Sequence, residues 1–432
     1  MVILTRRQLL LRAAYVAPIA VFTGGAAASC QRLTTAPSPL VRAPVVVRAP
    51  VVYYGINTHL SFLGEGAVWA NTDAAVDWLL ELGVGAVRQS LPRTGRGRAA
   101  VRSGMNLLGD EGVRWCCPIL DSGDVTSLNA ARRVVNEQLD WLESNTDLAL
   151  LDSLPGLNEP NSEGKAIADW AKLTRWAQQA IYEETRRRSA FDHVLVQGPP
   201  LNMKGGATQI TPDVEELGDL GQWLDRGDAH IYPGDDDPEV DVEERLALLA
   251  PLHPDKPVCV SEGGYTTSVN RGYTGGAELV SEEAAALYGP KQLLVHAMAG
   301  RPFFSYELLD EAPPLRDTER SVREAGFGLV RTPTTDPDSW SAKPGFDAIR
   351  RLLALVRDVD PTPAVTLPVR VTANTVDLRT ALLHRSDGTW LLAVWRAVDL
   401  YTWNRETLTG GAVDVQPEEV TVTLDGARPV AV

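Results

Sequence analysis

Apolar residues along most of the chain fall into short runs that stop at turn residues, and these runs alternate with longer stretches of helical periodicity. Short apolar runs of this kind are typical of buried parallel strands, and the longer stretches are typical of amphipathic helices. The pattern predicts eight strands, at residues 53–57, 85–88, 114–120, 154–157, 194–198, 228–232, 258–262 and 302–306. It predicts helices at 71–83, 128–142, 166–188, from 241, from 281 and at 344–356. Pro290 predicts a kink or split in the helix that begins at 281.

Strands and helices that alternate over residues 53–359 predict an α/β fold, a (β/α)8 TIM barrel. A doubly wound open sheet is the alternative, but no Gly-rich nucleotide-binding turn follows the first strand. Beyond residue 359 the pattern changes to short strands without helices, with Ser386-Asp387-Gly388 as a hairpin turn. Residues 360–432 therefore predict a small, sandwich-like all-β domain after the barrel. Its tryptophans either form a sugar-binding platform or pack in its core, namely Trp390, Trp395 and Trp403.

The first 29 residues have the features of an export signal. Residues 5–10 resemble the twin-arginine motif, and the apolar segment that follows is too short and too weak for a stable membrane helix. Ala27-Ala28-Ser29-Cys30 is a loose lipoprotein box, so Cys30 is either lipidated, as a membrane tether, or lies near an ordinary cleavage site. Residues 30–52 repeat a Pro-containing hexapeptide and predict an extended linker. We expect an exported bacterial protein, extracellular or associated with the cell envelope.

Composition limits the partners. Hydrophobic residues make up 44% of the chain and charged residues 22%, as in ordinary globular proteins, and the net charge is −15. This charge argues against nucleic acid as a partner, because phosphates attract basic surfaces, but it is compatible with a neutral sugar polymer. Cys116, Cys117 and Cys259 lie in apolar strands and are predicted to be buried free thiols. No zinc-ligand spacing is present, and neither a metal nor a cofactor is predicted.

Glu159 and Glu262 stand where two predicted strands break into loops. A carboxylate is costly to bury alone, so both side chains are expected to face the open end of the barrel. They lie about three strand–helix units apart, which places them on opposite walls. Two carboxylates that face each other in this way can cleave a glycosidic bond.

Several short motifs around these positions resemble the clan A glycoside hydrolases. They are Asn158-Glu159-Pro160 after the fourth strand, Ser261-Glu262-Gly263 after the seventh and His230-Ile231-Tyr232 after the sixth. The segments Tyr306-Glu307, Gly326-Phe327-Gly328-Leu329 and Lys343-Pro344-Gly345-Phe346 are similar to the branch with β-xylosidases, α-iduronidases and exopolysaccharide endoglycosidases. The resemblance covers residues 53–432.

The resemblance implies a retaining mechanism with Glu159 as acid/base and Glu262 as nucleophile. Such pairs are held about 5–5.5 Å apart, where both cannot easily be ionised, so one keeps its proton. It also implies that Asn158 binds the sugar hydroxyl beside the anomeric carbon and that Tyr232 donates to Glu262. Arg88 would hold Glu262 ionised through a charge-assisted hydrogen bond.

Other candidates for substrate contact are His230, lining the site, and Asn57 and His59 at the end of the first strand. Trp340 and Tyr265 are candidates for an aromatic face against a sugar ring. Asp235-Asp236-Asp237 either binds calcium or forms a solvated acidic loop.

The leading hypothesis is an exported retaining glycoside hydrolase that acts on an envelope or environmental polysaccharide. Three alternatives remain: a non-catalytic carbohydrate-binding envelope protein on the same barrel, a transglycosylase that uses the same residues, and a metal hydrolase. The last lacks the expected His-x-His ligand sets. The sequence leaves open the sugar, the anomeric configuration and endo or exo action.

Overall fold

A computed structural model describes residues 53–64, 66–162, 169–203, 207–268, 278–311, 325–359, 369–407 and 409–424, together with the backbone of residues 2–4, 9–10 and 40–42. Cys30 and nearly all of the predicted export signal and linker lie outside the described residues. Among the described residues, no helix is both long and apolar enough to cross a membrane.

Eight parallel strands form the central sheet, in the order β8-β7-β6-β5-β4-β11-β10-β9. They are β4 (Tyr54–Asn57), β5 (Ala86–Arg88), β6 (Arg114–Cys116), β7 (Leu151–Pro155), β8 (Leu195–Gln197), β9 (Gly227–His230), β10 (Val258–Gly263) and β11 (Phe303–Ser305). A parallel bridge from Gln197 to Arg226 joins the two edge strands, so the sheet closes. The (β/α)8 barrel is therefore confirmed, and the open sheet is excluded.

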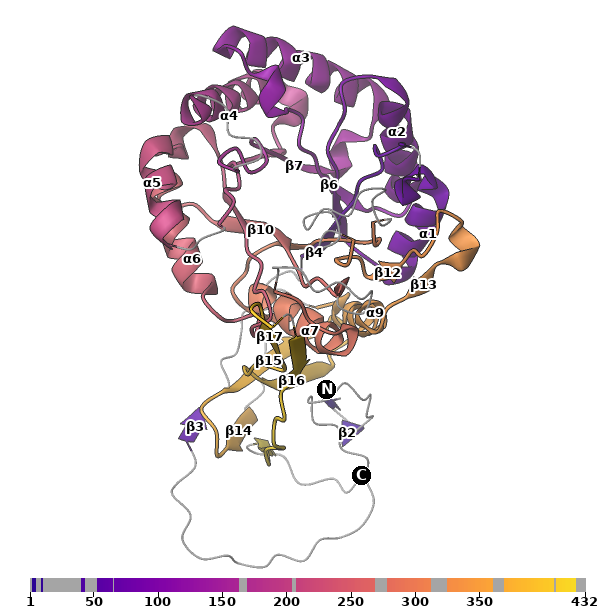
Figure 1. Cartoon of the computed structure of the whole chain (residues 1–432), viewed down its shortest axis with the longest axis vertical. Helices are drawn as coiled ribbons and strands as arrows, with labels where there is room; N and C mark the ends of the chain where they lie inside the picture. Colours follow the sequence, from indigo (N-terminus) through magenta and orange to yellow (C-terminus); the bar gives the residue numbers. More distant parts are fainter. Residues whose placement is uncertain are drawn as a thin grey trace, which may run out of the picture.

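Helices surround the barrel strands (Figure 1). They are α1 (Thr72–Leu82), α2 (Gly95–Gly109), α3 (Leu128–Asn145), α4 (Trp170–Arg186), α5 (Ala207–Leu217), α6 (Val242–Leu249), α7 (Glu282–Met298) and α9 (Pro344–Val356). Local signals set their limits: Ser127 caps α3 by accepting from the Ala130 amide, and α1 ends at Gly83 in the left-handed conformation. The predicted split at Pro290 is wrong, because α7 runs through this buried proline.

Side chains fill the interior of the barrel. Ala86, Cys116, Cys259 and Phe304 form one buried cluster there. Gly55 leaves room for Phe304, since a Cβ at this position would lie 2.2 Å from its ring. Full burial of a side chain such as Phe304 contributes roughly 1.5–3 kcal/mol. Cys117, next along the chain, points to the other face and belongs to the large apolar cluster that strands and helices share. All three described cysteines are buried free thiols, as predicted.

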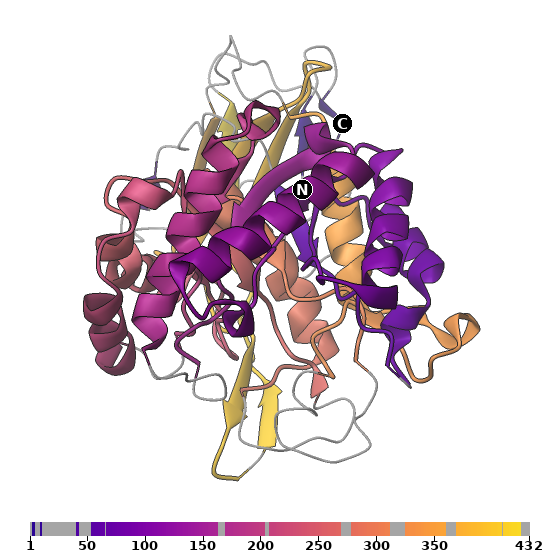
Figure 2. The same ribbon diagram turned by 90° about the horizontal axis from the view of Figure 1, so that it is seen from above.

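The C-terminal part is all-β, as predicted. Its strands are β14 (Val369–Ala373), β15 (Leu378–His384), β16 (Trp390–Arg396), β17 (Tyr401–Asn404), β18 (Thr409–Ala412) and β19 (Thr421–Leu424). They lie beyond α7 in Figure 1, and in the turned view they extend past the helices (Figure 2). Three short N-terminal strands join them: β1 (Val2–Leu4) pairs with β16, β2 (Leu9–Leu10) pairs with β1, and β3 (Leu40–Arg42) pairs with β14. Thus three residues of the predicted linker are part of a sheet.

The C-terminal tryptophans pack in cores rather than in a platform. Trp390, Trp395 and Trp403 are all buried, each in a different apolar cluster. A buried ion pair fastens this region to the barrel: Lys291 Nζ lies 2.8 Å from Asp237 Oδ2 and also donates to the Val398 carbonyl at 3.4 Å. Asp237 is therefore buried and paired, which corrects the interpretation of the acidic segment at this residue, whereas Asp236 is exposed as predicted.

Candidate active site

Strand register brings the predicted polar residues together at the carboxyl end of the barrel. Asn57 on β4 pairs with Arg88 on β5, and His230 on β9 pairs with Glu262 on β10. Glu159 follows β7 and lies near the end of β9, through its contact with His230. Because the carboxyl ends of parallel strands share one edge of a barrel, residues far apart in sequence meet there.

Glu262 is held between a cation and a phenol. Arg88 donates from Nη1 to Glu262 Oε1 at 2.6 Å, and Tyr232 donates from its hydroxyl to Oε2 at 2.7 Å. Burial, the largest single influence, lowers the pKa of the Arg88 guanidinium, but the charge of Glu262 together with Cys116, Asp228 and the hydrogen bond to Glu262 outweighs it, so this pKa lies above its ordinary value. Burial and then the charge of Glu262 raise the pKa of Tyr232 well above 10, so its hydroxyl stays a donor.

Arg88 also orders its polar neighbours. Its Nη1 donates to Asn57 Oδ1 at 3.0 Å, and its Nη2 donates to Asn158 Oδ1 at 2.7 Å. The Asn57 amide donates in turn to the Ser261 carbonyl at 2.9 Å. With its oxygen bound to Arg88, Asn158 has its amide hydrogens turned to other partners, as a sugar hydroxyl contact requires.

Glu159 has a histidine and an amide among its hydrogen-bonding partners. His230 Nδ1 is 3.0 Å from its Oε1, and the Asn202 amide donates to its Oε2 at 3.0 Å. Its backbone is in the left-handed region, with φ of 41°, directly before Pro160. A non-glycine residue there costs on the order of 1–3 kcal/mol. The hydrogen bond from the Glu159 amide to the Pro200 carbonyl, at 3.0 Å, helps to hold this conformation.

The two carboxylates are close to each other. One oxygen of Glu159, one of Glu262 and a ring nitrogen of His230 lie within 4.8 Å of one another. The same donor types can ligate a cation, but Arg88 and Tyr232 already occupy both oxygens of Glu262. A second group with the same spacing consists of His59, Glu307 and Glu311, in which His59 Nε2 lies 3.2 Å from Glu307 Oε2.

The two positions after Glu262, Gly263 and Gly264, leave no room for a side chain. A Cβ on Gly263 would lie 2.6 Å from the Ile231 carbonyl oxygen, and a Cβ on Gly264 would lie 2.4 Å from that of Tyr306. Real Cβ atoms do not approach other atoms so closely. The backbones after β9 and β11 can therefore approach β10 beside Glu262 only because these positions have no side chain.

Aromatic rings form one wall beside Glu262. Tyr232, Tyr306 and Phe327 lie edge to face, with ring centroids 5.4–6.2 Å apart. The His59 ring contacts Tyr306 at 5.7 Å and stacks on Phe62 at 4.6 Å. Phe62 is 50% exposed. His59 is thus part of this aromatic wall, and its role as a substrate contact stays a prediction.

Two predicted aromatic contacts point elsewhere. Trp340 is buried in the main apolar cluster and donates from Nε1 to the Thr334 carbonyl at 3.0 Å. Tyr265 stacks on Tyr288 at 4.7 Å, within the cluster that joins the barrel to β17, and donates to the Asp236 carbonyl. Buried rings offer little face to a sugar, and Tyr306, Phe327 and Phe62 are better placed for that role.

The sequence reasoning assigned no role to Asn202, Asp228 or Ser261 in this site. Asn202 follows β8 by a few residues, and no motif marks it. Ser261 and Asp228 lie inside strands that were predicted, and both are buried, so only their contacts show that they belong to the site. The one signal in the sequence that could have pointed to Ser261 and Asp228 was a polar residue within an otherwise apolar strand.

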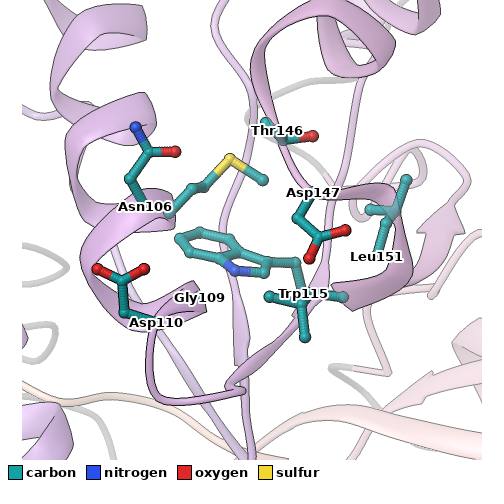
Figure 3. A pocket seen from close by; sticks show the side chains of 9 residues that line it. Asn106, Gly109, Asp110, Trp115, Thr146, Asp147 and Leu151 are labelled. Carbon is teal, nitrogen blue, oxygen red and sulfur yellow. The ribbon is translucent and has the colours of Figure 1, made fainter.

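A separate pocket of about 190 Å³ lies at the opposite end of the barrel (Figure 3). Its walls come from the end of α2, from β6, and from the loop and short helix before β7, with Trp115 and Asp147 among them. Catalytic residues of this fold lie at the carboxyl ends of the strands, so this pocket is not the candidate site.

The fold and the paired glutamates define a (β/α)8 barrel with two carboxylates at its mouth. Solved structures with the same fold include the endo-beta1,6-glucanase BT3312, 11% identical over 85% of this chain and 90% of its own, with a TM-score of 0.54. Another is an endo-laminarinase from Formosa, 14% identical over 66% of this chain and 84% of its own, with a TM-score of 0.50. Such low identities establish the shared fold alone. No family model matches the chain, and no curated protein matches it significantly in sequence. The fold of TIM-barrel glycoside hydrolases is thus supported, whereas the xylosidase and iduronidase branch stays a prediction.

Proposed function

We propose that this protein is a retaining glycoside hydrolase with Glu262 as nucleophile and Glu159 as acid/base. The observation that carries the proposal is the pair of carboxylates with oxygens within 4.8 Å, one beside the Arg88 cation and the other beside His230. Retaining enzymes hold their two carboxyls about 5–5.5 Å apart, whereas inverting enzymes need about 6.5–9.5 Å to admit a water.

The surroundings support this division of roles. Arg88 and Tyr232 favour a negative charge on Glu262, which can attack the anomeric carbon as Glu159 protonates the leaving oxygen. The glycosyl–Glu262 ester then forms as the glycosidic bond breaks. In the second step Glu159, now a carboxylate, takes a proton from water, whose oxygen attacks the anomeric carbon and releases Glu262.

The substrate we propose is an envelope or environmental polysaccharide, reached after export of the protein. The predicted export signal supports this location, and the exposed ring of Phe62 supports a chain of sugars that extends from the site. Glucan-cleaving enzymes among the structural neighbours make β-glucans the first polymers to assay.

A mechanism-based label tests the nucleophile. A panel of 2-deoxy-2-fluoro glycosides is incubated with the protein, and the labelled peptide is identified by mass spectrometry. The label is expected on Glu262, and a label on any other residue contradicts the assignment. Product analysis with an added oligosaccharide then separates hydrolysis from transglycosylation, which uses the same residues.

Leaving-group dependence tests the acid. Glu159→Gln should lower kcat/KM on glycosides with poor leaving groups by about 10²–10⁴-fold and spare activated aryl glycosides, which need little protonation. Equal losses on both substrates would argue against an acid role for Glu159.

A further inference from the structure

A line of hydrogen bonds leads from the candidate site to a buried carboxylate that the mechanism above does not use. Arg226 donates from Nε to Gln197 Oε1 at 2.6 Å, which fixes the orientation of the Gln197 amide. The Gln197 amide nitrogen then donates to Asp228 Oδ2 at 2.6 Å. Arg226 has no acceptor role, so the direction of these two bonds is set.

Asp228 accepts hydrogen bonds on both oxygens. The Ala229 amide donates to Oδ1 at 2.8 Å, and the Ser261 hydroxyl donates to Oδ2 at 2.9 Å. The pKa of Asp228 lies above its ordinary value, because burial outweighs the charges of His230 and Arg88 and the bonds from Gln197 and Ser261, which lower it. With three donors aimed at it, the carboxylate acts as an ionised acceptor.

The bond to Asp228 uses the only hydrogen of the Ser261 hydroxyl. Ser261 Oγ also lies 3.2 Å from His230 Nε2, so in this contact Ser261 must accept and Nε2 must carry the hydrogen. The other ring nitrogen, Nδ1, lies 3.0 Å from Glu159 Oε1. A single hydrogen bond there needs one proton, carried either by Glu159 or by Nδ1.

We propose that Asp228 is a positioning residue for the acid/base: through Ser261 it keeps His230 protonated on Nε2, so that Glu159 and His230 share the catalytic proton. The inference rests on the proposed function. In the first step the shared proton moves to the leaving oxygen through Glu159 as the bond to carbon breaks. In the second step water returns one proton to the pair, and its oxygen bonds to the anomeric carbon in place of Glu262. Asp228 and Ser261 gain and lose nothing in the cycle.

His230 has charged and titratable neighbours from several strands. These are Glu159 after β7, Asp228 on the same strand β9, Tyr232 just beyond it, Glu262 on β10 and Arg88 on β5. Glu262 Oε1 lies 3.4 Å from His230 Nε2, so the hydrogen on Nε2 faces this carboxylate as well as Ser261. The contacts of Nε2 with Ser261 and with Glu262 both favour a hydrogen on Nε2.

Asp228→Asn tests the proposal because an amide cannot accept hydrogen bonds on both of its polar atoms. When its oxygen keeps the bond from the Ala229 amide, its nitrogen displaces the Gln197 amide, which donates to this position in the wild-type protein, and donates to Ser261. Ser261 then donates to His230 Nε2, Nδ1 carries the hydrogen, and Glu159 becomes an acceptor without a proton. We expect kcat/KM on poor leaving groups to fall about 10–100-fold, activated aryl glycosides to be spared, and the basic limb of the pH profile to move to lower pH.

Two further variants keep the test sharp if Asp228→Asn folds poorly. Ser261→Ala removes the link but leaves Asp228 with Gln197 and Ala229, and a smaller change of the same pattern is expected. Asp237→Asn is the matched control, since Asp237 is an equally buried carboxylate with a different partner, Lys291. It should lower the melting temperature and lower kcat on all substrates to the same extent, without altering leaving-group dependence or the pH profile.

The outcomes separate the two proposals. If Asp228→Asn and Ser261→Ala match Asp237→Asn while the wild-type protein is labelled on Glu262, the shared proton is refuted and the glycosidase stands. If the wild-type protein is not labelled on Glu262, the proposed function fails, whatever the variants do.

Discussion

The surroundings of Glu262 and of Glu159 differ in charge, in backbone and in exposure. Glu262 is near the end of β10, where the register with both neighbouring strands shifts, has Arg88 and Tyr232 on its two oxygens, and its side chain is 10% exposed. Glu159 follows a strand in a left-handed conformation, has His230 and Asn202 as partners, and its side chain is 18% exposed. In the proposed roles, the carboxylate that stays charged has a fixed cation beside it, whereas the one that gains and loses a proton has partners that tolerate both states. Two identical residues acquire different chemistry from their neighbours.

The largest effect is expected from removing each carboxylate in turn. Glu262→Gly and Glu159→Gly should each lower kcat by about 10⁴-fold or more on poor leaving groups. Azide should restore turnover of an activated glycoside in both variants, because it fits the vacated space. The glycosyl azide should have inverted configuration with Glu262→Gly and retained configuration with Glu159→Gly, as NMR can show. The same configuration from both variants would contradict the assigned roles.

Arg88→Lys should have the next largest effect. Lysine keeps the charge but cannot contact Glu262, Asn57 and Asn158 from one planar group. We expect kcat/KM to fall by about 10²-fold on good and poor leaving groups alike, since the nucleophile serves both. Arg301→Lys, at an ion pair with exposed Glu243, is the control and should leave kcat/KM unchanged. A loss confined to poor leaving groups would place Arg88 with the acid instead.

Tyr232→Phe removes a single donor from Glu262. A lost hydrogen bond to a charged group corresponds to about tenfold in kcat/KM. Tyr265→Phe is a matched control, because Tyr265 is buried and donates its hydroxyl to the Asp236 backbone carbonyl, away from Glu262. The control should lose stability without losing activity. Equal losses of kcat/KM in the two variants would contradict a role for Tyr232 as a donor to Glu262.

The smallest effect is expected on the pH dependence of stability. It shows how much of any loss of activity at low pH comes from unfolding rather than from titration of active-site groups. Burial, with a smaller contribution from Arg301, lowers the pKa of His296 on α7 to about 3. The unfolded chain, with an ordinary histidine pKa near 6.5, then binds the proton first, so stability is lost as the pH falls below about 6.5. His296→Gln should reduce this loss by roughly 1 kcal/mol per pH unit, measured by urea unfolding between pH 7 and 5. An unchanged slope would mean that other groups set the acid limit.

The barrel was predictable because its strands are short, apolar and bounded by turns. Two of its helices were not: α2 begins in Gly95-Arg96-Gly97-Arg98, and α5 contains Pro212, and glycine and proline are typical of loops, although each helix buries one apolar face. Tertiary packing fixes these helices against the sheet where local preference does not. The sheet position of residues 40–42 also depends on a partner strand more than 300 residues away, which no local pattern reveals.

The charged members of the site were predictable from their places at strand ends, and the aromatic ones were not. Tyr265 lies only three residues after Glu262, but its ring turns toward Tyr288. Nearness along the chain does not set the direction of a side chain in a loop, whereas register in a strand does. For that reason Arg88 and His230 lie where expected, while Asn202 was missed and Trp340 is buried in the core.

The buried pair of Lys291 and Asp237 also affects how the chain can be truncated and how its C-terminal strands can be exchanged between homologues. The loop that begins with His230 and Tyr232 continues directly into Asp237, whose amide donates to Asp399 beyond β16. A shortened version that stops after α9 would therefore strip partners from the segment that carries two active-site side chains. The C-terminal strands therefore hold the segment after β9 in place. Swapping these strands between homologues is expected to lower turnover before it unfolds the barrel.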